Sequence, residues 1–341
     1  MTVERDYRAA DGRYERLEYR RAGDSGLDLP ALSLGLWQKF GRDYPFGTQR
    51  EILLHAFDLG ITHFDNANRY GPPHRAAEQV FGQVLRTDLA PYRDELILTS
   101  KAGNPIGPSP YLKGGSRKSL LVSLERSLRD LGTDYVDIFY HHRPDPSTPL
   151  DETVGALVSA VQQGKALYVG ISNYPTERAH EVAALLRAAG VPLLVHQPRY
   201  SIFDRTPETS GLLKLAAEDG FGLVAYSPLA QGLLTDKYLD GTIPAGARAA
   251  ASAFLSPDQI DDVYRERATA LNELARERGQ SLAQLALQWV LRQPQVTTAL
   301  IGASSTTQLD HNLAALDFPA LTDEELTRID HHGIHGTGQR V

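Results

Sequence analysis

The sequence has 341 residues, of which 42% are hydrophobic and 23% charged, and its formal net charge is −7. These proportions are typical of a globular protein with a sizeable core and exclude disorder as the first reading. The acidic balance and the lack of a basic stripe exclude a nucleic-acid binder, although one local arginine or helix N-terminus can still hold an anion. Because there are no cysteines, disulfides, thiolate catalysis and zinc–thiolate sites are excluded as well.

The first residues, Met1–Arg8, are charged and no apolar stretch follows them, so they do not resemble a secretory signal. No apolar run approaches the roughly 18 residues that a membrane span needs. We therefore expect a soluble, cytoplasmic protein with neither a membrane nor nucleic acid among its partners.

Short apolar segments of strand length alternate along the chain with longer segments of helical period. The strand-like segments are Leu32–Leu36, Thr62–Phe64, Leu96–Ser100, Val136–His141, Ala166–Gly170, Leu193–His196, Gly222–Tyr226 and Thr298–Ile301. Most are rich in Val, Ile, Leu and aromatic residues without strict alternation, which is typical of parallel strands covered on both faces.

Helical signals fill the intervals between these strands. Capping boxes are expected at Thr48 with Glu51, Ser281 with Gln284, Ser305 with Gln308, and Thr322 with Glu325. Eight strands, each followed by a helix, favour an α/β fold of the (β/α)8 TIM barrel type over an open doubly wound sheet. An open sheet that binds a dinucleotide usually carries a Gly-x-Gly-x-x-Gly turn, which is missing here. We predict one domain over residues 1–341, with the barrel at about 31–332.

Two features are predicted around the barrel. Residues 16–31 read as an N-terminal β-hairpin around Gly23–Gly26, which would close the N-terminal end of the barrel. Long loops, Ala102–Ser116 and Ser227–Pro257, follow strands 3 and 7 of the barrel. Structureless connections beyond roughly 12–15 residues are usually functional lids or disordered segments, and both readings are open for these two loops.

Polar residues follow most of the predicted strands directly. They are the segments Asp65–Tyr70, Ser100–Lys101, His141–Arg143, Ser172–Tyr174, His196–Gln197, Tyr226–Ser227 and Gly302–Ser304. In a (β/α)8 barrel the carboxyl ends of all the strands meet at one rim, and that rim carries the active site. Strand ends are polar in many barrels, but seven such positions together predict a site.

Four of these residues suit the chemistry of a carbonyl group. Lys101 beside Tyr70 would favour the tyrosinate and lower the pKa of the phenol from about 10, with Asp65 paired to the lysine. A tyrosine tuned in this way donates a proton to a developing alkoxide. His142 would hydrogen-bond the same oxygen. Together they would reduce a carbonyl if a hydride donor is present, and no metal is needed.

Each residue also has an ordinary structural reading. Asp65 alone is more often a strand-end or capping residue, Lys101 a surface lysine with a buried stem, and Tyr70 part of a turn. Neighbouring strand residues point to opposite faces, so only one of His141 and His142 can face the site. The other is expected to pack into the barrel wall.

The stretch from Gly60 to Gly71 resembles the aldo-keto reductase signature Gly-x-x-x-x-Asp-x-Ala-x-x-Tyr-Gly. Further along, Leu98–Lys101 and Asp134–Pro144 resemble the catalytic-lysine strand of that family and its Asp-Tyr-x-Asp…His…Pro strand. The three motifs occur in the family's order, and the resemblance extends from about residue 19 to residue 330.

The resemblance implies roles for the four polar residues. Tyr70 would be the general acid, Lys101 and Asp65 would tune it, and His142 would occupy the family's histidine position. Many members have Trp after this histidine, whereas this chain has Arg143.

The resemblance also implies that the protein binds NADPH/NADP+ without a Rossmann turn. The implied cofactor-binding residues are Gly35, Leu36, Trp37, Asp65, Ser172, Asn173, Gln197, Tyr226, Ser227, Pro228, Leu229, Gln231, Gly232, Lys237, Arg248, Gly302, Ser304, Gln308 and Asn312. The nicotinamide would lie near Asn173, the pyrophosphate near Lys237, and the 2′-phosphate near Arg248. This placement agrees with the phosphate sites that barrels often form after strands 7 and 8.

Within the family, the segments Leu34–Trp37, Tyr70–Pro73, Gly115–Lys118 and Ser227–Leu234 resemble a bacterial branch of L-glyceraldehyde 3-phosphate reductases, neighbours of the potassium channel β subunits. The branch implies NADPH-dependent reduction of an aldehyde or ketone to an alcohol. It also implies a small or phosphorylated aldehyde as the substrate, such as L-glyceraldehyde 3-phosphate, and a homo-oligomer.

Two other functions are open at the level of sequence. An NADPH-binding regulatory subunit resembling the channel β subunits would share the barrel, but those proteins carry Asn at the position of His142. A metal-dependent barrel hydrolase or isomerase would use histidines on the predicted strands, although packing is the simpler role for them, and we predict no metal. Possible substrate contacts at the rim are Trp37, Arg69, Tyr111, Lys113 and Arg117.

Overall fold

The computed structural model describes residues 7–244, 248–251 and 255–333. Its strands are β1 (Tyr19–Arg21), β2 (Asp28–Pro30), β3 (Leu32–Gly35), β4 (His63–Asp65), β5 (Ile97–Ala102), β6 (Val136–His141), β7 (Ala166–Ser172), β8 (Leu193–Gln197), β9 (Gly222–Ala225) and β10 (Val296–Ile301). All eight predicted barrel strands are present, with ends shifted by at most two residues.

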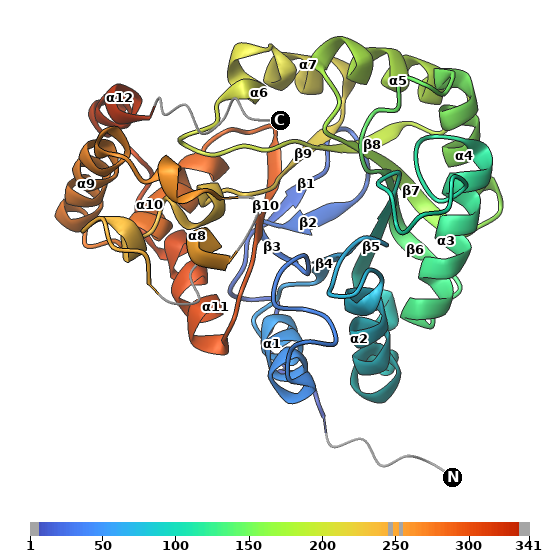
Figure 1. Ribbon diagram of the computed structural model, residues 1–341, viewed down its shortest axis with the longest axis horizontal. Helices are drawn as coiled ribbons and strands as arrows, with labels where there is room; N and C mark the ends of the chain where they lie inside the picture. Colours follow the sequence, from blue (N-terminus) through green and yellow to red (C-terminus); the bar gives the residue numbers. More distant parts are fainter. Residues whose placement is uncertain (1–6, 245–247, 252–254, 334–341) are drawn as a thin grey trace.

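Strands β3 to β10 form a closed barrel of parallel strands in the order β10-β3-β4-β5-β6-β7-β8-β9. The barrel closes because β10 pairs on one side with β3 and on the other with β9. Helices surround the strands (Figure 1). The predicted (β/α)8 fold is confirmed, and the open doubly wound sheet is excluded.

The helices are α1 (Phe46–Asp58), α2 (Ala76–Val84), α3 (Arg117–Leu131), α4 (Leu150–Gln162), α5 (Thr176–Ala188), α6 (Thr206–Thr209), α7 (Leu212–Asp219), α8 (Arg248–Ala251), α9 (Asp262–Glu277), α10 (Leu282–Leu291), α11 (Thr306–Leu313) and α12 (Asp323–His332). The predicted capping boxes at Ser281 and Thr322 are confirmed at α10 and α12. The box predicted at Thr48 is wrong, because α1 already begins after Pro45.

The predicted N-terminal hairpin is confirmed as the antiparallel pair β1–β2. It lies across the middle of the ring of strands in Figure 1. Ala22 and Leu29 of the hairpin are fully buried and pack with Leu194 and Val224 of the barrel. The guanidinium of Arg20 donates to the carbonyl oxygen of Leu291 at 2.8 Å. The hairpin therefore closes one end of the barrel with an apolar plug.

Alternation along the strands decides what faces the inside of the barrel. On β6, Tyr140 points inward, and a Cβ atom added at Gly170 would lie 2.5 Å from its ring. Ser100 of β5 points outward to α2, whereas its neighbour Lys101 lies inside. Tyr140 thus fills the inside of the barrel beneath the carboxyl rim, and polar side chains lie at the rim itself.

Both predicted long loops follow the carboxyl ends of their strands. Residues 103–116 join β5 to α3, and residues 226–247 follow β9. The second loop contains the short 3-10 turns Ala230–Gly232 and Asp236–Tyr238. Residues 245–247 and 252–254 within the predicted range lie outside the described part of the chain.

Candidate active site

A buried ion pair lies at the carboxyl end of β4 and β5. Lys101 Nζ and Asp65 Oδ2 are 2.5 Å apart, and neither side chain is more than 1% exposed. The other oxygen, Asp65 Oδ1, accepts hydrogen bonds at 3.0 Å from Thr99 Oγ1 and from Gln197 Nε2. A buried charge is tolerated only when it is paired and hydrogen-bonded, and both conditions are met here.

The ammonium of Lys101 has three N–H groups, and the structure supplies three acceptors for them. These are Asp65 Oδ2 at 2.5 Å, the carbonyl oxygen of Asn66 at 2.9 Å and the hydroxyl of Tyr70 at 3.2 Å. A protonated lysine can only donate, so the hydroxyl of Tyr70 accepts from it. The hydroxyl proton of Tyr70 is therefore available to a different acceptor.

The expected lowering of the pKa of Tyr70 is not found. Burial and the Asp65 carboxylate raise the pKa of Tyr70 well above its ordinary value of 10.0. Burial also lowers the pKa of Lys101, and the Asp65 carboxylate counteracts this. Because Asp65 largely balances the lysine charge, Tyr70 stays protonated near neutral pH and is held as a proton donor.

His142 faces the same site as Tyr70. Their ring centroids are 5.9 Å apart in an edge-to-face arrangement. Burial, followed by the Lys101 charge, lowers the pKa of His142 well below 6.5, so its imidazole is neutral at pH 7. A neutral imidazole can donate one hydrogen bond to a ligand oxygen without competing as an acid.

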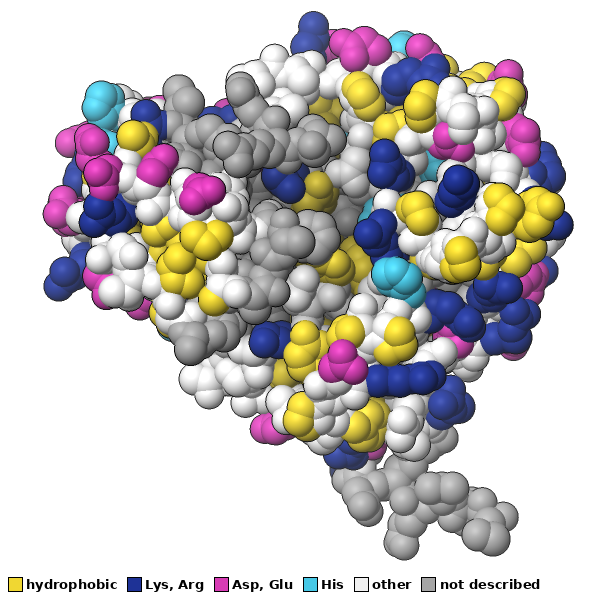
Figure 2. Space-filling model, in the orientation of Figure 1, with side chains coloured by type: hydrophobic (Ala, Val, Ile, Leu, Met, Phe, Trp, Pro, Cys, Tyr) yellow, Lys and Arg dark blue, Asp and Glu magenta, His cyan; other side chains and the backbone are white. Residues whose placement is uncertain are grey.

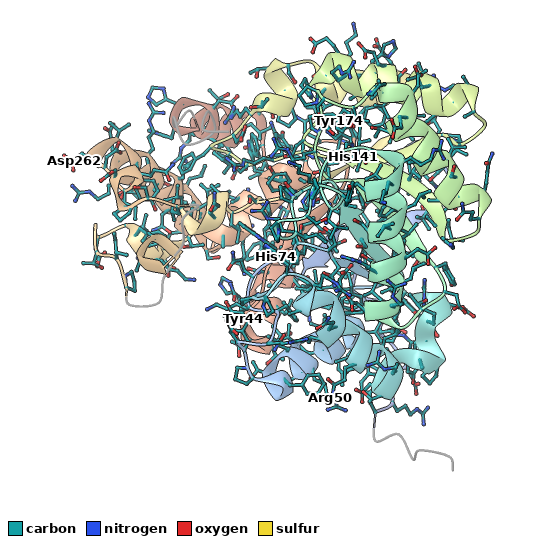
Figure 3. The ribbon with its side chains drawn as sticks, turned by 45° about the vertical axis from the view of Figure 1, so that its right-hand side comes forward. Tyr44, Arg50, His74, His141, Tyr174 and Asp262 are labelled. Atoms are coloured by element: carbon teal, nitrogen blue, oxygen red, sulfur yellow. The ribbon has the colours of Figure 1, made fainter. Side chains whose placement is uncertain are left out.

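His141 points the opposite way, as the alternation along the strand predicts. Its Nδ1 lies 2.6 Å from the hydroxyl of Tyr174, and burial lowers its pKa to about 4. The two side chains lie together in Figure 3. Next to them, the backbone N–H of Tyr174 donates to Nε2 of His196 at 3.2 Å. His141 and His196 therefore support the wall behind the site.

In the part of the chain that the structure describes, no three His, Cys, Asp or Glu side chains converge as metal ligands do. His63 Nδ1 lies 2.9 Å from Ser33 Oγ, and the residue is fully buried inside the barrel. The histidines of the strands thus have packing or hydrogen-bonding roles. Over the same residues, no helix is both long and apolar enough to cross a membrane.

A cleft of about 580 Å³ opens at the carboxyl rim of the barrel. Its lining includes these predicted residues: Gly35, Trp37, Asp65, Tyr70, His142, Ser172, Asn173, Gln197, Tyr226, Ser227, Pro228, Leu229, Gln231, Gly232, Lys237, Gly302, Ser304 and Gln308. Figure 2 shows a central hollow on this face with Lys and Arg side chains beside it. Most of the predicted residues are therefore brought to one cavity from seven different strand ends.

Several predicted residues do not line the cleft. Leu36, Asn312 and Lys101 are buried in its walls. Arg248 is the first residue of α8, and its side chain lies outside what the structure describes. Three predicted rim contacts, Tyr111, Lys113 and Arg117, are also absent from the lining. Arg117 begins α3 instead and donates to Ser159 of α4 at 2.6 Å.

The cleft is also lined by residues that were not predicted, namely Gln38, Lys39, Tyr44, Asn104, Arg199, Thr235, Tyr238, Leu300, Ile301 and Ala303. Most of them lie in the loops after β3 and β9 or at the end of β10. Polarity after a strand end could have indicated Gln38 and Lys39. Arg199 had no comparable signal, because it follows a proline beyond the end of β8.

The volume of the cleft is that of a small-molecule or cofactor site, and polar side chains at its two ends are held in fixed orientations. Sites for small molecules and cofactors commonly enclose about 300–1,000 Å³. At one end, the Asn173 amide donates to the carbonyl of His142 and accepts from the hydroxyl of Tyr226, which fixes its orientation. At the other end, Gln308 Oε1 accepts from the backbone N–H of Ser304 at 2.9 Å. This bond replaces the box predicted at Ser305, whose hydroxyl still caps α11.

The fold and the cleft together define an α/β barrel with a polar site at its carboxyl rim. A sequence model of the Aldo/keto reductase family matches residues 31–334. The chain therefore belongs to the aldo/keto reductase family, whose members generally use a nicotinamide cofactor.

Among curated proteins, the chain is 52% identical over 328 residues to the L-glyceraldehyde 3-phosphate reductase of Escherichia coli (strain K12), covering 95% of this chain and 94% of that protein. It is 36% identical over 319 residues to a probable voltage-gated potassium channel subunit beta of Arabidopsis thaliana, covering 92% and 96%. Both similarities extend over nearly the whole chain.

Solved structures give the same result. The aldo-keto reductase AKR11C1 from Bacillus halodurans, in its holo form, matches with a TM-score of 0.73 and 27% identity over 95% of this chain and 100% of that chain. The thermostable aldo-keto reductase Tm1743, in complex with the inhibitor epalrestat, matches with a TM-score of 0.73 and 31% identity over 93% and 100%.

Proposed function

We propose that the protein reduces a small or phosphorylated aldehyde, such as L-glyceraldehyde 3-phosphate, to the alcohol with NADPH, and that Tyr70 is the proton donor. The observation that carries this proposal is the arrangement of Lys101, whose three N–H groups all have acceptors. Tyr70 is one of them, so its own proton is free for a ligand in the cleft. The name of the Escherichia coli relative supports the choice of substrate.

The side chains of the site divide the work of the reaction. When bound, the reduced nicotinamide supplies a hydride to the carbonyl carbon. His142 and Tyr70 would hydrogen-bond the carbonyl oxygen and orient it. As negative charge develops on that oxygen, Tyr70 would transfer its proton to it, and Lys101 would stabilise the tyrosinate that remains. Solvent would then return a proton to Tyr70.

Several cleft residues would hold the cofactor. Asn173, Ser172 and Gln197 would bind the carboxamide of the nicotinamide, and Tyr226 would stack on its ring. Lys237 forms no ion pair with a described carboxylate, which leaves its charge for the pyrophosphate. Preference for NADPH over NADH would depend on Arg248 and on the residues around Gln308.

Tyr70→Phe tests the proposal. This variant removes only the hydroxyl, and we expect aldehyde-dependent oxidation of NADPH to fall by about 10²–10⁴-fold, the usual contribution of a general acid. L-Glyceraldehyde 3-phosphate, methylglyoxal and a nitrobenzaldehyde would serve as substrates. Tyr111→Phe, which removes a hydroxyl from a side chain that is 60% exposed and outside the cleft, is the matched control.

Cofactor binding can be followed independently of turnover. The chain has two tryptophans, of which Trp37 lines the cleft and Trp289 is fully buried. NADPH should therefore quench the fluorescence of Trp37 in both the parent protein and Tyr70→Phe. Tyr70→Phe protein that binds NADPH and still reduces aldehydes at the parent rate would refute the role of Tyr70.

A regulatory function is the second candidate, and similarity to the Arabidopsis thaliana channel subunit favours it. That function would be supported if NADPH quenches the tryptophan fluorescence of the protein but none of the aldehydes causes NADPH to be oxidised. We also propose that the protein is cytoplasmic and forms a homo-oligomer. Light scattering on the purified protein would test the oligomeric state.

A further inference from the structure

The cleft is positively charged although the protein carries a formal net charge of −7. Its lining contains four permanent cations, Lys39, Arg69, Arg199 and Lys237, and a single acid, Asp65. That acid is already paired with buried Lys101. A cleft with an excess of one sign of charge concentrates ligands of the other sign. The cavity therefore favours anionic ligands, and the four cations responsible are not among the proposed catalytic residues.

These cations differ in the partners that their side chains already have. Arg199 Nε lies 3.9 Å from Asp204 Oδ2, so part of its charge is neutralised. Lys237 lies in the loop after β9, where the cofactor phosphates are proposed to bind. Arg69 forms no ion pair and no side-chain hydrogen bond with any residue in the described ranges, although it is half-buried. Its five N–H donors are thus left for a ligand or for solvent.

The backbone that carries Arg69 is fixed on three sides. The N–H of Asn68 donates to the carbonyl of Lys101 at 3.1 Å, and the N–H of Tyr70 donates to the carbonyl of Ala67 at 2.9 Å. The carbonyl of Arg69 itself lies 3.0 Å from Nδ1 of His74. A guanidinium on such a fixed segment can select a ligand by geometry as well as by charge.

Arg69 also lies at the reacting end of the cleft. It directly precedes Tyr70, lines the same cavity as Tyr70 and His142, and its charge contributes to the low pKa of His142. Lys39 lines the cleft from the loop after β3. That loop is joined to the segment after Tyr70 by a hydrogen bond from the N–H of Arg42 to the carbonyl of Pro72 at 2.9 Å.

We propose that Arg69 is the anion subsite of the substrate, binding the phosphate monoester of a short aldehyde whose carbonyl lies against Tyr70 and His142, with Lys39 adding charge from the neighbouring loop. This inference rests on the proposed reductase function and names the residue that would set its substrate class. A planar guanidinium binds phosphate through two parallel hydrogen bonds, which gives orientation as well as affinity. The aldehyde end would thereby be held at one distance from the proton donor.

The test compares two aldehydes that differ only in the phosphate, glyceraldehyde 3-phosphate and glyceraldehyde. In Arg69→Gln, kcat/KM for the phosphorylated aldehyde should fall roughly 10- to 100-fold, the value of one charged hydrogen-bonded contact. For glyceraldehyde it should change less than about 3-fold. Arg69→Lys should retain part of the preference, because it keeps the charge and loses the fork. Arg42→Gln, which removes an exposed guanidinium outside the cleft, should leave both values unchanged.

An equal fall for both aldehydes in Arg69→Gln would overturn the subsite, because Arg69 would then support the site as a whole. No fall for either aldehyde, or an unmodified protein that reduces both equally well, would overturn it too. The reductase proposal survives all three results.

A binding measurement covers the case in which no aldehyde is reduced. Protein loaded with NADP+ would be titrated calorimetrically with glycerol 3-phosphate and, as a control, with glycerol. Binding of the phosphate alone, weakened roughly 10-fold or more in Arg69→Gln, would support the subsite even if the reductase proposal failed. No binding of glycerol 3-phosphate to the parent protein would overturn the subsite.

Discussion

Asp65→Asn is expected to destabilise the protein strongly at neutral pH. The substitution keeps the shape of the side chain but removes the carboxylate paired with buried Lys101, whose Nζ lies 2.5 Å from Asp65 Oδ2. Removing one partner of a buried pair costs about 3–5 kcal/mol, because the remaining charge is left uncompensated. The new amide would also direct N–H groups either at the ammonium or at the Thr99 and Gln197 donors that now bind Oδ1.

The loss should shrink as the pH rises. Burial lowers the pKa of Lys101 and the Asp65 carboxylate raises it, so the variant has the lower pKa. Between that value and the unfolded value of about 10.4, the unfolded chain binds more protons than the folded protein. The free energy of unfolding therefore increases with pH in this window. The difference between the parent protein and Asp65→Asn should be smaller at pH 9.5 than at pH 7.

Urea unfolding at the two pH values measures this difference, and Asp88→Asn provides the control. Asp88 Oδ1 lies 2.5 Å from Arg50 Nη2, the same distance as in the Lys101 pair. Because a guanidinium stays charged across this range, the loss in Asp88→Asn should not change with pH. A loss in Asp65→Asn that is equally constant from pH 7 to 9.5 would show that Lys101 does not lose its proton, and would refute the reasoning.

Two further predictions concern buried positions of helix α2, the protonation of Glu78 and the packing of Gly82. Glu78 is fully buried, accepts from Ser100 Oγ at 2.6 Å, and has a pKa that burial raises from 4.5 to about 7. Protonation of Glu78 therefore stabilises the fold by about 3 kcal/mol below pH 4.5, and this contribution is lost as the pH rises through 7. Because glutamine does not titrate, the free energy of unfolding should fall less steeply between pH 4.5 and 7 in Glu78→Gln than in the parent protein. In Gly82→Ala, the new Cβ would lie 2.2 Å from the carbonyl oxygen of Asp130, and overpacking α2 against α3 should cost about 1–3 kcal/mol in thermal unfolding. Gly47→Ala in α1 has no neighbour within 4 Å of its Cβ and should instead be neutral or stabilising, so a comparable loss there would contradict the steric explanation.

The sequence was sufficient for the barrel and for most of the cleft, for one geometric reason. Parallel strands with helical returns bring their carboxyl ends to one rim, so Asp65, Lys101 and His142 converge although they come from three different strands. Alternation along β6 then separated His142, which lines the cleft, from His141, which packs against Tyr174. The alternation of side chains along a strand and the alternation of strands with helices along the chain can both be read directly from the sequence.

Loop contacts were less predictable because loops lack such a period. Arg117 was expected at the rim but starts α3, where Ser116 caps the helix and Ser159 of α4 receives the guanidinium. Arg69 was named as one of five possible rim contacts. Its distinguishing feature, the lack of a described partner, depends on the whole tertiary structure and leaves no mark in the sequence.

The direction of the pKa shift of Tyr70 shows why a proximity argument alone is insufficient. Lysine beside tyrosine was expected to lower the pKa of the phenol, but Asp65 lies closer to Lys101 than Tyr70 does, at 2.5 Å against 3.2 Å. The carboxylate therefore offsets the ammonium while Tyr70 is neutral, and burial keeps the phenol protonated. In the proposed reaction, negative charge appears on Tyr70 only as its proton leaves. Lys101 is already in place at that moment, held by two other acceptors, and its attraction is greatest for the charged state that the reaction creates.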